Sequence, residues 1–133
     1  QDLEIEVTES LLIHHPEQAA RVLGALRESG VRLALDDFGT GWSSLGSLKR
    51  FPFSALKIDR DFVAGIGRDA NDEAIVRAVV AMGQNLRLEV VAEGVESAAH
   101  VEFAAALGCD YAQGYHFSPP VTIERIEEML REA

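Results

Sequence analysis

The sequence predicts an α/β fold built on a parallel sheet, from three observations. Short apolar segments rich in Val, Ile and Leu alternate with longer segments of helical periodicity. Proline or glycine stands at several of the transitions between them. The chain has 133 residues, 47% of them hydrophobic, which is enough for one domain with its own core. Repeated strand–helix units of this kind form parallel sheets.

The first half of the chain holds three predicted strands. Residues 3–7 alternate apolar and charged side chains with period two, as a half-buried strand does. Pro16 opens a helix, since the first helical turn does not use the backbone donor that proline lacks, and Gly30 ends it. The apolar face of this helix carries Ala19, Val22, Leu23 and Leu26. The next predicted elements are a strand at 31–35, a glycine-rich turn at 38–41, a short helix at 43–49 and a strand at 54–58.

The second half continues the alternation. Asn71 is expected to cap a longer helix, because its side chain can accept a backbone N–H of the first turn. A strand at 88–92 and a helix at 97–107 follow, and Gly108 ends that helix. The apolar face of the longer helix carries Ile75, Val79, Met82 and Leu86. The remaining elements are a short strand at 111–112 and a last helix that starts at Thr122 and carries Ile123, Ile126 and Leu130.

Two architectures fit five strand–helix units. A doubly wound domain would be complete at this length. A (β/α)₈ barrel needs about 250 residues, so the chain would then be its C-terminal part. The sequence begins without Met and enters a strand pattern at once, which we interpret as the start of a fragment. We therefore expect the C-terminal five units of a barrel.

Composition excludes several classes of protein. The 22 acidic residues outnumber the 12 Lys and Arg residues, giving a net charge of −10, so we expect no DNA binding. A single cysteine excludes an internal disulfide framework and a Cys-rich zinc site. No apolar run reaches the roughly 18 residues of a membrane span, and no signal-peptide pattern opens the chain. We expect a cytoplasmic location.

Polar residues follow the predicted strands at their carboxyl ends. These ends meet at one edge of a parallel sheet, so the side chains should converge there. Strand parity agrees, because Asp36 shares a face with Ala34 and Lys57 points away from the apolar face of its strand. Clustered carboxylates repel one another unless a cation neutralises them, and oxygen ligands favour Mg²⁺ or Mn²⁺. The residues in question are Glu6, Asp36, Asp37, Lys57, Glu93 and Gln113.

Five segments in this order resemble the EAL-domain family, the bacterial cyclic di-GMP phosphodiesterases. The resemblance runs from residue 3 to about residue 120, and the segment Asp-Asp-Phe-Gly-Thr-Gly-Trp-Ser-Ser-Leu is highly specific. Trp42 stands where the family commonly has Tyr. The family's fold is a modified (β/α)₈ barrel. The segments are Glu6–Ser10, Asp36–Leu45, Leu56–Asp59, Ala92–Glu96 and Gln113–Tyr115.

The resemblance implies a two-metal site. Glu6, Asp36 and Asp37 match the family's metal-coordinating carboxylates, with Asp36 shared between two Mg²⁺ or Mn²⁺ ions. Lys57 matches the lysine that contacts the attacking water and a metal ligand. Glu93 matches the glutamate assigned as general base or metal ligand. Gln113 matches the glutamine that holds metal-bound water, and it completes the set of residues at the metals.

The resemblance also implies supporting roles. Glu9 matches a glutamate that orders the loop after Asp37, and Glu96 matches a residue near a metal or its water. That loop would link the site to a homodimer contact. Its first residues are Phe38, Gly39, Thr40 and Gly41.

The implied reaction is hydrolysis of cyclic di-GMP to linear pGpG in bacterial second-messenger signalling. The family's Glu-Ala-Leu segment, which supplies a metal ligand, does not occur in this sequence. We therefore expect residues 1–133 to be a partial EAL domain that is poorly active or inactive alone. The parent protein is expected to carry the missing strands and an upstream GGDEF, PAS, receiver or membrane sensor module.

Three other functions remain open. A catalytically inactive EAL domain would bind cyclic di-GMP as a receptor, and the residue at the upstream Glu-Ala-Leu position would decide this. A receiver domain has five similar units, but its acidic pair follows the first strand, whereas here the pair follows the second. A Mg²⁺-dependent barrel enzyme of other specificity gives no reason for the Asp-Asp-Phe-Gly segment.

Overall fold

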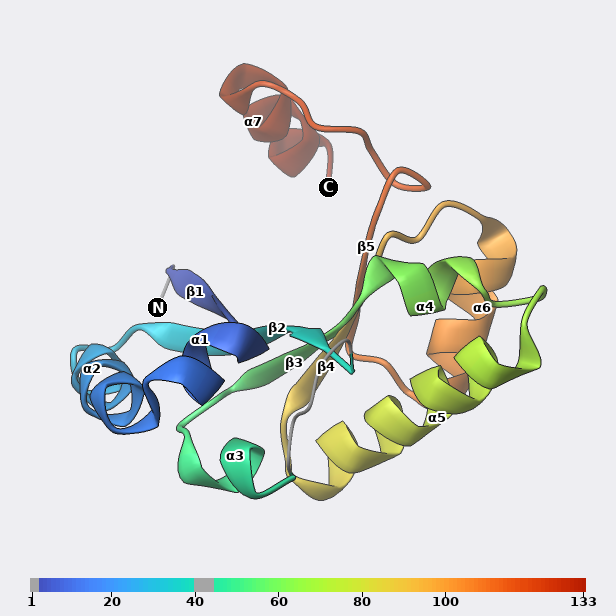
Figure 1. Ribbon diagram of the computed structural model, residues 1–133. Helices are drawn as coiled ribbons and strands as arrows, with labels where there is room; N and C mark the ends of the chain where they lie inside the picture. Colours follow the sequence, from blue (N-terminus) through green and yellow to red (C-terminus); the bar gives the residue numbers. More distant parts are fainter. Residues whose placement is uncertain (1–2, 40–44) are drawn as a thin grey trace.

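The computed structural model describes residues 3–39 and 45–133 (Figure 1). Strands and helices alternate, as the sequence predicts. The elements are β1 (Glu4–Thr8), α1 (Glu9–His14), α2 (Pro16–Glu28), β2 (Arg32–Phe38), α3 (Leu45–Arg50), β3 (Ala55–Ile58), α4 (Arg60–Ala64), α5 (Ala70–Asn85), β4 (Glu89–Glu93), α6 (Ala98–Leu107), β5 (Tyr111–Gln113) and α7 (Ile123–Glu132).

The order of the strands decides between the two predicted architectures. The described strands form one sheet in the order β1-β2-β3-β4-β5, and each strand pairs in parallel with the next. A doubly wound sheet reverses direction at a switch point, whereas strands of a barrel follow one another in a single direction. Helices α2, α3, α5 and α6 lie on one side of the sheet (Figure 1). The arrangement is that of a barrel segment.

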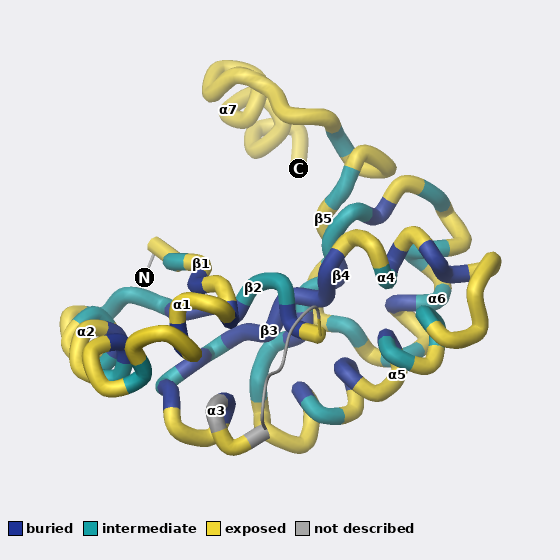
Figure 2. Tube along the Cα trace, in the orientation of Figure 1, coloured by how far each residue is buried: buried dark blue, intermediate teal, exposed yellow. Residues whose placement is uncertain are grey.

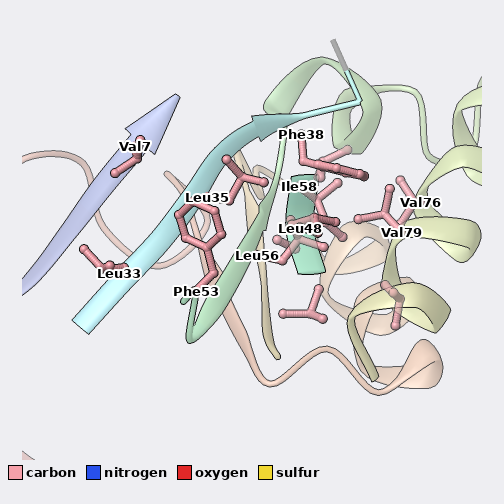
Figure 3. Close-up of a cluster of buried hydrophobic side chains, with 14 of the residues drawn as sticks. Val7, Leu33, Leu35, Phe38, Leu48, Phe53, Leu56, Ile58, Val76 and Val79 are labelled. Atoms are coloured by element: carbon pink, nitrogen blue, oxygen red, sulfur yellow. The ribbon is translucent and has the colours of Figure 1, made fainter. Parts of the chain in front are cut away.

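The helix-facing side of the sheet holds the hydrophobic core (Figure 3). Leu33 and Leu35 of β2, and Leu56 and Ile58 of β3, are almost fully buried. They pack with α5 residues such as Val76. Because side chains alternate along a strand, the residues between these leucines face the other side. That other side carries the polar residues.

One irregularity interrupts the sheet at the end of β2. Between Leu35 and Phe38 the register with β3 shifts, since three steps along β2 match two along β3. Asp37 lies in this bulge with a φ of 56°. A bulge adds one residue to a strand and redirects the side chains around it. The alternation predicted for β2 therefore stops at Asp36, and the strand runs on to Phe38, where the sequence predicted a turn.

The helix ends follow polar caps, one of which lies two residues before the predicted position. Asp69, not Asn71, caps α5, because its carboxylate accepts the N–H groups of Asn71 and Asp72. The backbone of Asp69 is extended, as a cap requires, and Asn71 already lies within the helix. The left-handed Gly108 ends α6, as predicted, and Ser97, predicted as the first residue of this helix, is its cap.

One residue of the predicted apolar face of α2 and the whole predicted apolar face of α7 are exposed. Val22 of α2 is 50% exposed, because that helix packs through Ala19 and Leu23. No residue of α7 is buried, so Ile126 and Leu130 lie at the surface (Figure 2). None of the helices in the described part of the chain has the length and apolar content needed to cross a membrane.

Candidate metal centre

Three carboxylates from three strands meet on the polar side of the sheet. Glu6 of β1, Asp36 of β2 and Glu93 of β4 each place a carboxylate oxygen within 4.8 Å of the other two. Glu6 pairs in register with Ala34, two residues before Asp36, so both acidic side chains point to the same face. We call these three residues the carboxylate cluster. The sequence predicted that they would converge, and the structure brings them together.

Lys57 of β3 lies inside this cluster. It forms ion pairs with Glu6 and with Glu93, the latter at 2.6 Å between Nζ and Oε1. Its side chain is only 4% exposed. Burial alone would lower the pKa of Lys57, but the hydrogen bonds and charges of Glu6 and Glu93 outweigh burial and raise it. Lys57 is therefore a fixed positive charge that holds two carboxylates in place. We call Glu6, Lys57 and Glu93 the lysine trio.

The pKa of Glu93 is raised above its ordinary value. Burial is the largest cause; the hydrogen bond and charge of Lys57 oppose it, and the charge and hydrogen bond of Asp36 add to it. A carboxylate in this position takes up a proton more readily than one in water. A raised pKa favours proton acceptance, which is what a general base does.

Asp37 lies apart from the carboxylate cluster. Its N–H donates to Asp36 Oδ1 at 2.8 Å, and its φ of 56° turns the chain at this point. Burial raises the pKa of the Asp37 carboxyl, and so do the charge of Asp36 and a hydrogen bond with the side chain of Asp59, while Arg60 lowers it. The two adjacent aspartates thus have different neighbours. Asp36 lies close to Glu6 and Glu93, and Asp37 lies close to Asp59.

Asp59 belongs to the neighbourhood of the site, although the sequence prediction assigned it no role. It is buried after β3, and its Oδ1 accepts the N–H of Asp61 at 2.8 Å, which caps the short helix α4. The signal in the sequence was an acidic residue directly after a strand of apolar residues. Neither α4 nor α1 was predicted, because helices of five or six residues are too short to show a 3.6-residue period.

A cavity of about 500 Å³ opens beside the cluster. Glu6 and Lys57 line it, and Gln113 at the end of β5 lines the same space. Gln113 is exposed, so its amide is accessible from the cavity. The predicted ligand Gln113 therefore faces the same cavity as Glu6 and Lys57.

The supporting residues are placed differently. Glu9 is 5% exposed, and neither carboxylate oxygen has a hydrogen-bond partner among the described residues. Glu96 is exposed, and its N–H donates to His100 Nδ1 at 3.3 Å, outside the cluster. Phe38 is buried in the core and Gly39 has a φ of 96°. The predicted loop residues Thr40 and Gly41 lie outside the described residues.

A second charged group lines the same cavity, at the amino-terminal ends of the strands. Arg32 of β2 forms an ion pair with Glu89 of β4 and another with Glu4 of β1, the latter at 3.3 Å between Nε and Oε2. The hydrogen bond and charge of Glu89 are the main causes that raise the pKa of Arg32. We call Glu4, Arg32 and Glu89 the arginine trio. The sequence prediction missed this group, although Glu4 and Glu6 stand two residues apart on one strand.

The donor set fits a hard divalent cation. The cluster offers carboxylate oxygens from separate strands, beside an accessible cavity, and carboxylates gathered this closely repel one another unless a cation balances them. Lys57 balances part of this charge. The arrangement defines the class of protein as an α/β barrel segment with an acidic, oxygen-rich site at the carboxyl ends of its strands.

Comparison with known proteins gives the family. The family model described as the EAL domain matches residues 1–120, so the chain belongs to the EAL domain family. The cyclic di-GMP phosphodiesterase NbdA of Pseudomonas aeruginosa is 47% identical over 129 residues, which is 97% of this chain and 16% of NbdA. The chain therefore spans less than a fifth of the length of this relative.

Solved structures agree with this assignment. The structure of the PaMucR phosphodiesterase in complex with c-di-GMP has a TM-score of 0.89 and 46% identity, covering 93% of this chain and 50% of that one. Klebsiella pneumoniae BlrP1, in manganese and calcium complexes with cyclic di-GMP, has a TM-score of 0.80 and 41% identity, covering 88% of this chain and 30% of that one. The fold predicted from the sequence is confirmed.

Proposed function

We propose that this chain is the C-terminal part of a metal-dependent phosphodiesterase domain that hydrolyses cyclic di-GMP to linear pGpG. The observation that carries the proposal is the meeting of Glu6, Asp36 and Glu93 around the buried Lys57. Relatives at 47% and 44% identity are named cyclic di-GMP phosphodiesterases, which supports the substrate. The BlrP1 complexes support the use of a divalent metal.

We assign the metal ligands as Glu6, Asp36, Asp37, Glu93 and Gln113. Asp36 would be shared between two Mg²⁺ or Mn²⁺ ions, since it belongs to the carboxylate cluster and also accepts the N–H of Asp37, the next proposed ligand. Two ions held in this way activate water and shield the phosphoryl group during in-line attack. Asp59 holds Asp37 in place through their hydrogen bond.

The protein side chains supply proton transfer and positioning. Glu93, with its raised pKa, can accept the proton of the attacking water. Lys57 holds Glu93 and Glu6 together and places a positive charge next to the reacting phosphate. Both residues act from strands, which fixes their positions better than a loop would.

The remaining assignments concern the whole protein. We propose that strands carrying the Glu-Ala-Leu segment complete the barrel, and that residues 1–133 alone are poorly active. Glu9 would order the loop after Asp37, because its buried carboxylate has no partner among the described residues. We further propose that the whole protein is a cytoplasmic homodimer carrying other signalling domains.

The test is chromatography of cyclic di-GMP incubated with the N-terminally complete domain in Mg²⁺ or Mn²⁺. The wild-type domain should yield linear pGpG. Asp36→Asn should lose at least about a thousandfold in rate, because both metal positions depend on Asp36. Glu102→Gln, which removes an exposed carboxylate from α6, is the matched control and should keep the wild-type rate.

Two outcomes would contradict the proposal. If the complete domain binds cyclic di-GMP tightly but leaves it intact, the protein is a receptor. If the Asp36→Asn variant retains the wild-type rate, the carboxylate cluster is not the reacting site.

A further inference from the structure

An exposed arginine follows β3 at the carboxyl edge of the sheet, which we call the rim. Arg60 is the first residue of α4 and directly follows Asp59, the buried residue that caps this helix. Its side chain is 82% exposed. The position is fixed at its base and free at its tip, because the backbone is held by the capped helix and the guanidinium lies in solvent.

The stem of Arg60 packs against the segment that follows Glu93. Gly94 has a φ of 70°, and a Cβ on Gly94 would lie 2.5 Å from the Cβ of Arg60. Only glycine allows this close approach between the ends of β3 and β4. Arg60 is thereby set beside the chain that carries Glu93.

A second observation places Arg60 at the edge of the sheet that carries the acidic site. Ile58, two residues before Arg60, pairs in register with Phe38 of β2 and with Ala92 of β4. Phe38 directly follows Asp37, and Ala92 directly precedes Glu93. Arg60 therefore follows β3 at the level where β2 carries Asp37 and β4 carries Glu93.

Arg60 is little engaged by the protein itself. Its ion pair with Asp61 spans 4.0 Å between two exposed side chains, and such pairs hold weakly in water. Lys57, in contrast, is buried and bound to two carboxylates. The net charge of −10 repels an anionic substrate, so binding at this rim needs an accessible cation.

We propose that Arg60 is a substrate-binding residue that contacts a phosphate of the cyclic dinucleotide at the mouth of the site. This inference rests on the proposed function. The guanidinium can donate two parallel hydrogen bonds to phosphate oxygens, and the stem on Gly94 orients it. Arg60 contributes to affinity for the substrate and leaves proton transfer to Glu93.

The test compares three variants of the N-terminally complete protein in Mn²⁺. Arg60→Gln keeps the Cβ and Cγ atoms that contact Gly94 but removes the charge, and Arg60→Lys keeps the charge without the planar donors. Arg68→Gln removes the same charge from another exposed arginine eight residues along the chain and is the control. KM and kcat for cyclic di-GMP are measured for each, with Kd measured by calorimetry.

Arg60→Gln should raise KM about tenfold, as expected for the loss of hydrogen bonds to a charged group, and change kcat less than about threefold. Arg60→Lys should raise KM by a smaller factor, and Arg68→Gln should leave KM within about twofold.

Three results would overturn the inference. They are an unchanged KM in Arg60→Gln, an equal rise in Arg68→Gln, or a fall in kcat at constant KM. If the wild-type protein binds without hydrolysis, the proposed function fails, and the same comparison of Kd values still decides the role of Arg60. If the wild-type protein does not bind cyclic di-GMP, both proposals fail.

Discussion

Two groups on the polar side of this sheet each combine one cationic side chain with two glutamates, but their surroundings differ. The lysine trio and the arginine trio each place one cation between a carboxylate of β1 and a carboxylate of β4. The arginine trio lines the same cavity as Glu6 and Lys57 of the lysine trio. They lie at successive positions along the strands, since Glu4 and Glu6, like Arg32 and Asp36, share a face.

The difference lies in burial and in the balance of charge. The side chain of Arg32 is 34% exposed and its carboxylate partners are similarly exposed, whereas Lys57 is 4% exposed. Asp36 is an additional neighbour of Glu6 and Glu93, so three carboxylates lie close together at a site with one ammonium. A cation between two carboxylates therefore does not by itself indicate a reactive site. A buried cation surrounded by more negative charge than it balances does indicate one, because a metal ion can neutralise the remaining charge.

The largest expected effect comes from removing each cation. Lys57→Met should reduce the rate of cyclic di-GMP hydrolysis by about a hundredfold or more, because Glu93 and Glu6 lose the charge that positions them. Arg32→Met should change the rate by less than about threefold, since its partners lie at the far end of the strands. Steady-state rates of the complete domain test this, and circular dichroism checks that both variants fold. Equal losses in the two variants would remove the distinction between the trios.

The stabilisation that Mn²⁺ gives the folded domain should depend on the carboxylate cluster and not on the arginine trio. At a Mn²⁺ concentration a hundredfold above Kd, the free energy of unfolding should rise by about 2.7 kcal/mol. Asp36→Asn should abolish most of this gain, and Arg32→Met should retain it. Thermal unfolding of the complete domain with and without Mn²⁺ measures the effect. A gain that survives in Asp36→Asn would place the metal elsewhere.

A smaller effect should appear as a function of pH in the metal-free domain. Burial raises the pKa of Glu93 above 4.5, so the folded protein keeps a proton that the unfolded chain releases. The contribution of Glu93 to stability is therefore fully present below pH 4.5 and is lost as the pH rises through the folded pKa. Urea unfolding between pH 4 and pH 8 should show a less steep decline in Glu93→Gln than in wild type. A decline that is as steep in the variant would show that Glu93 does not carry this linkage.

Much of this site was predictable from strand parity. The alternation in residues 3–7 and the position of Lys57 between Leu56 and Ile58 were sufficient to predict that Glu6 and Lys57 would meet. The same parity would have placed Arg32 on that face. Arg32 stands at the start of its strand, however, and the prediction of a polar site concerned the carboxyl ends.

The rest depended on features that periodicity does not encode. The bulge in β2 gives Asp37 a positive φ and shifts the register with β3, and a single added residue leaves no pattern in the sequence. The cap of α5 fell on Asp69, since Asp69 and Asn71 are both competent caps and the backbone decides between them. The contact between Arg60 and Gly94 joins residues 34 positions apart, which no local rule reaches.

The most direct test of the account pairs one substitution in each trio. Glu93→Gln and Glu89→Gln make the same chemical change on one strand, four residues apart. In the complete domain with Mn²⁺, hydrolysis of cyclic di-GMP should fall by about a hundredfold or more in Glu93→Gln and by less than about threefold in Glu89→Gln. Similar rates in the two variants, or a greater loss in Glu89→Gln, would contradict the assignment of the reaction to the lysine trio.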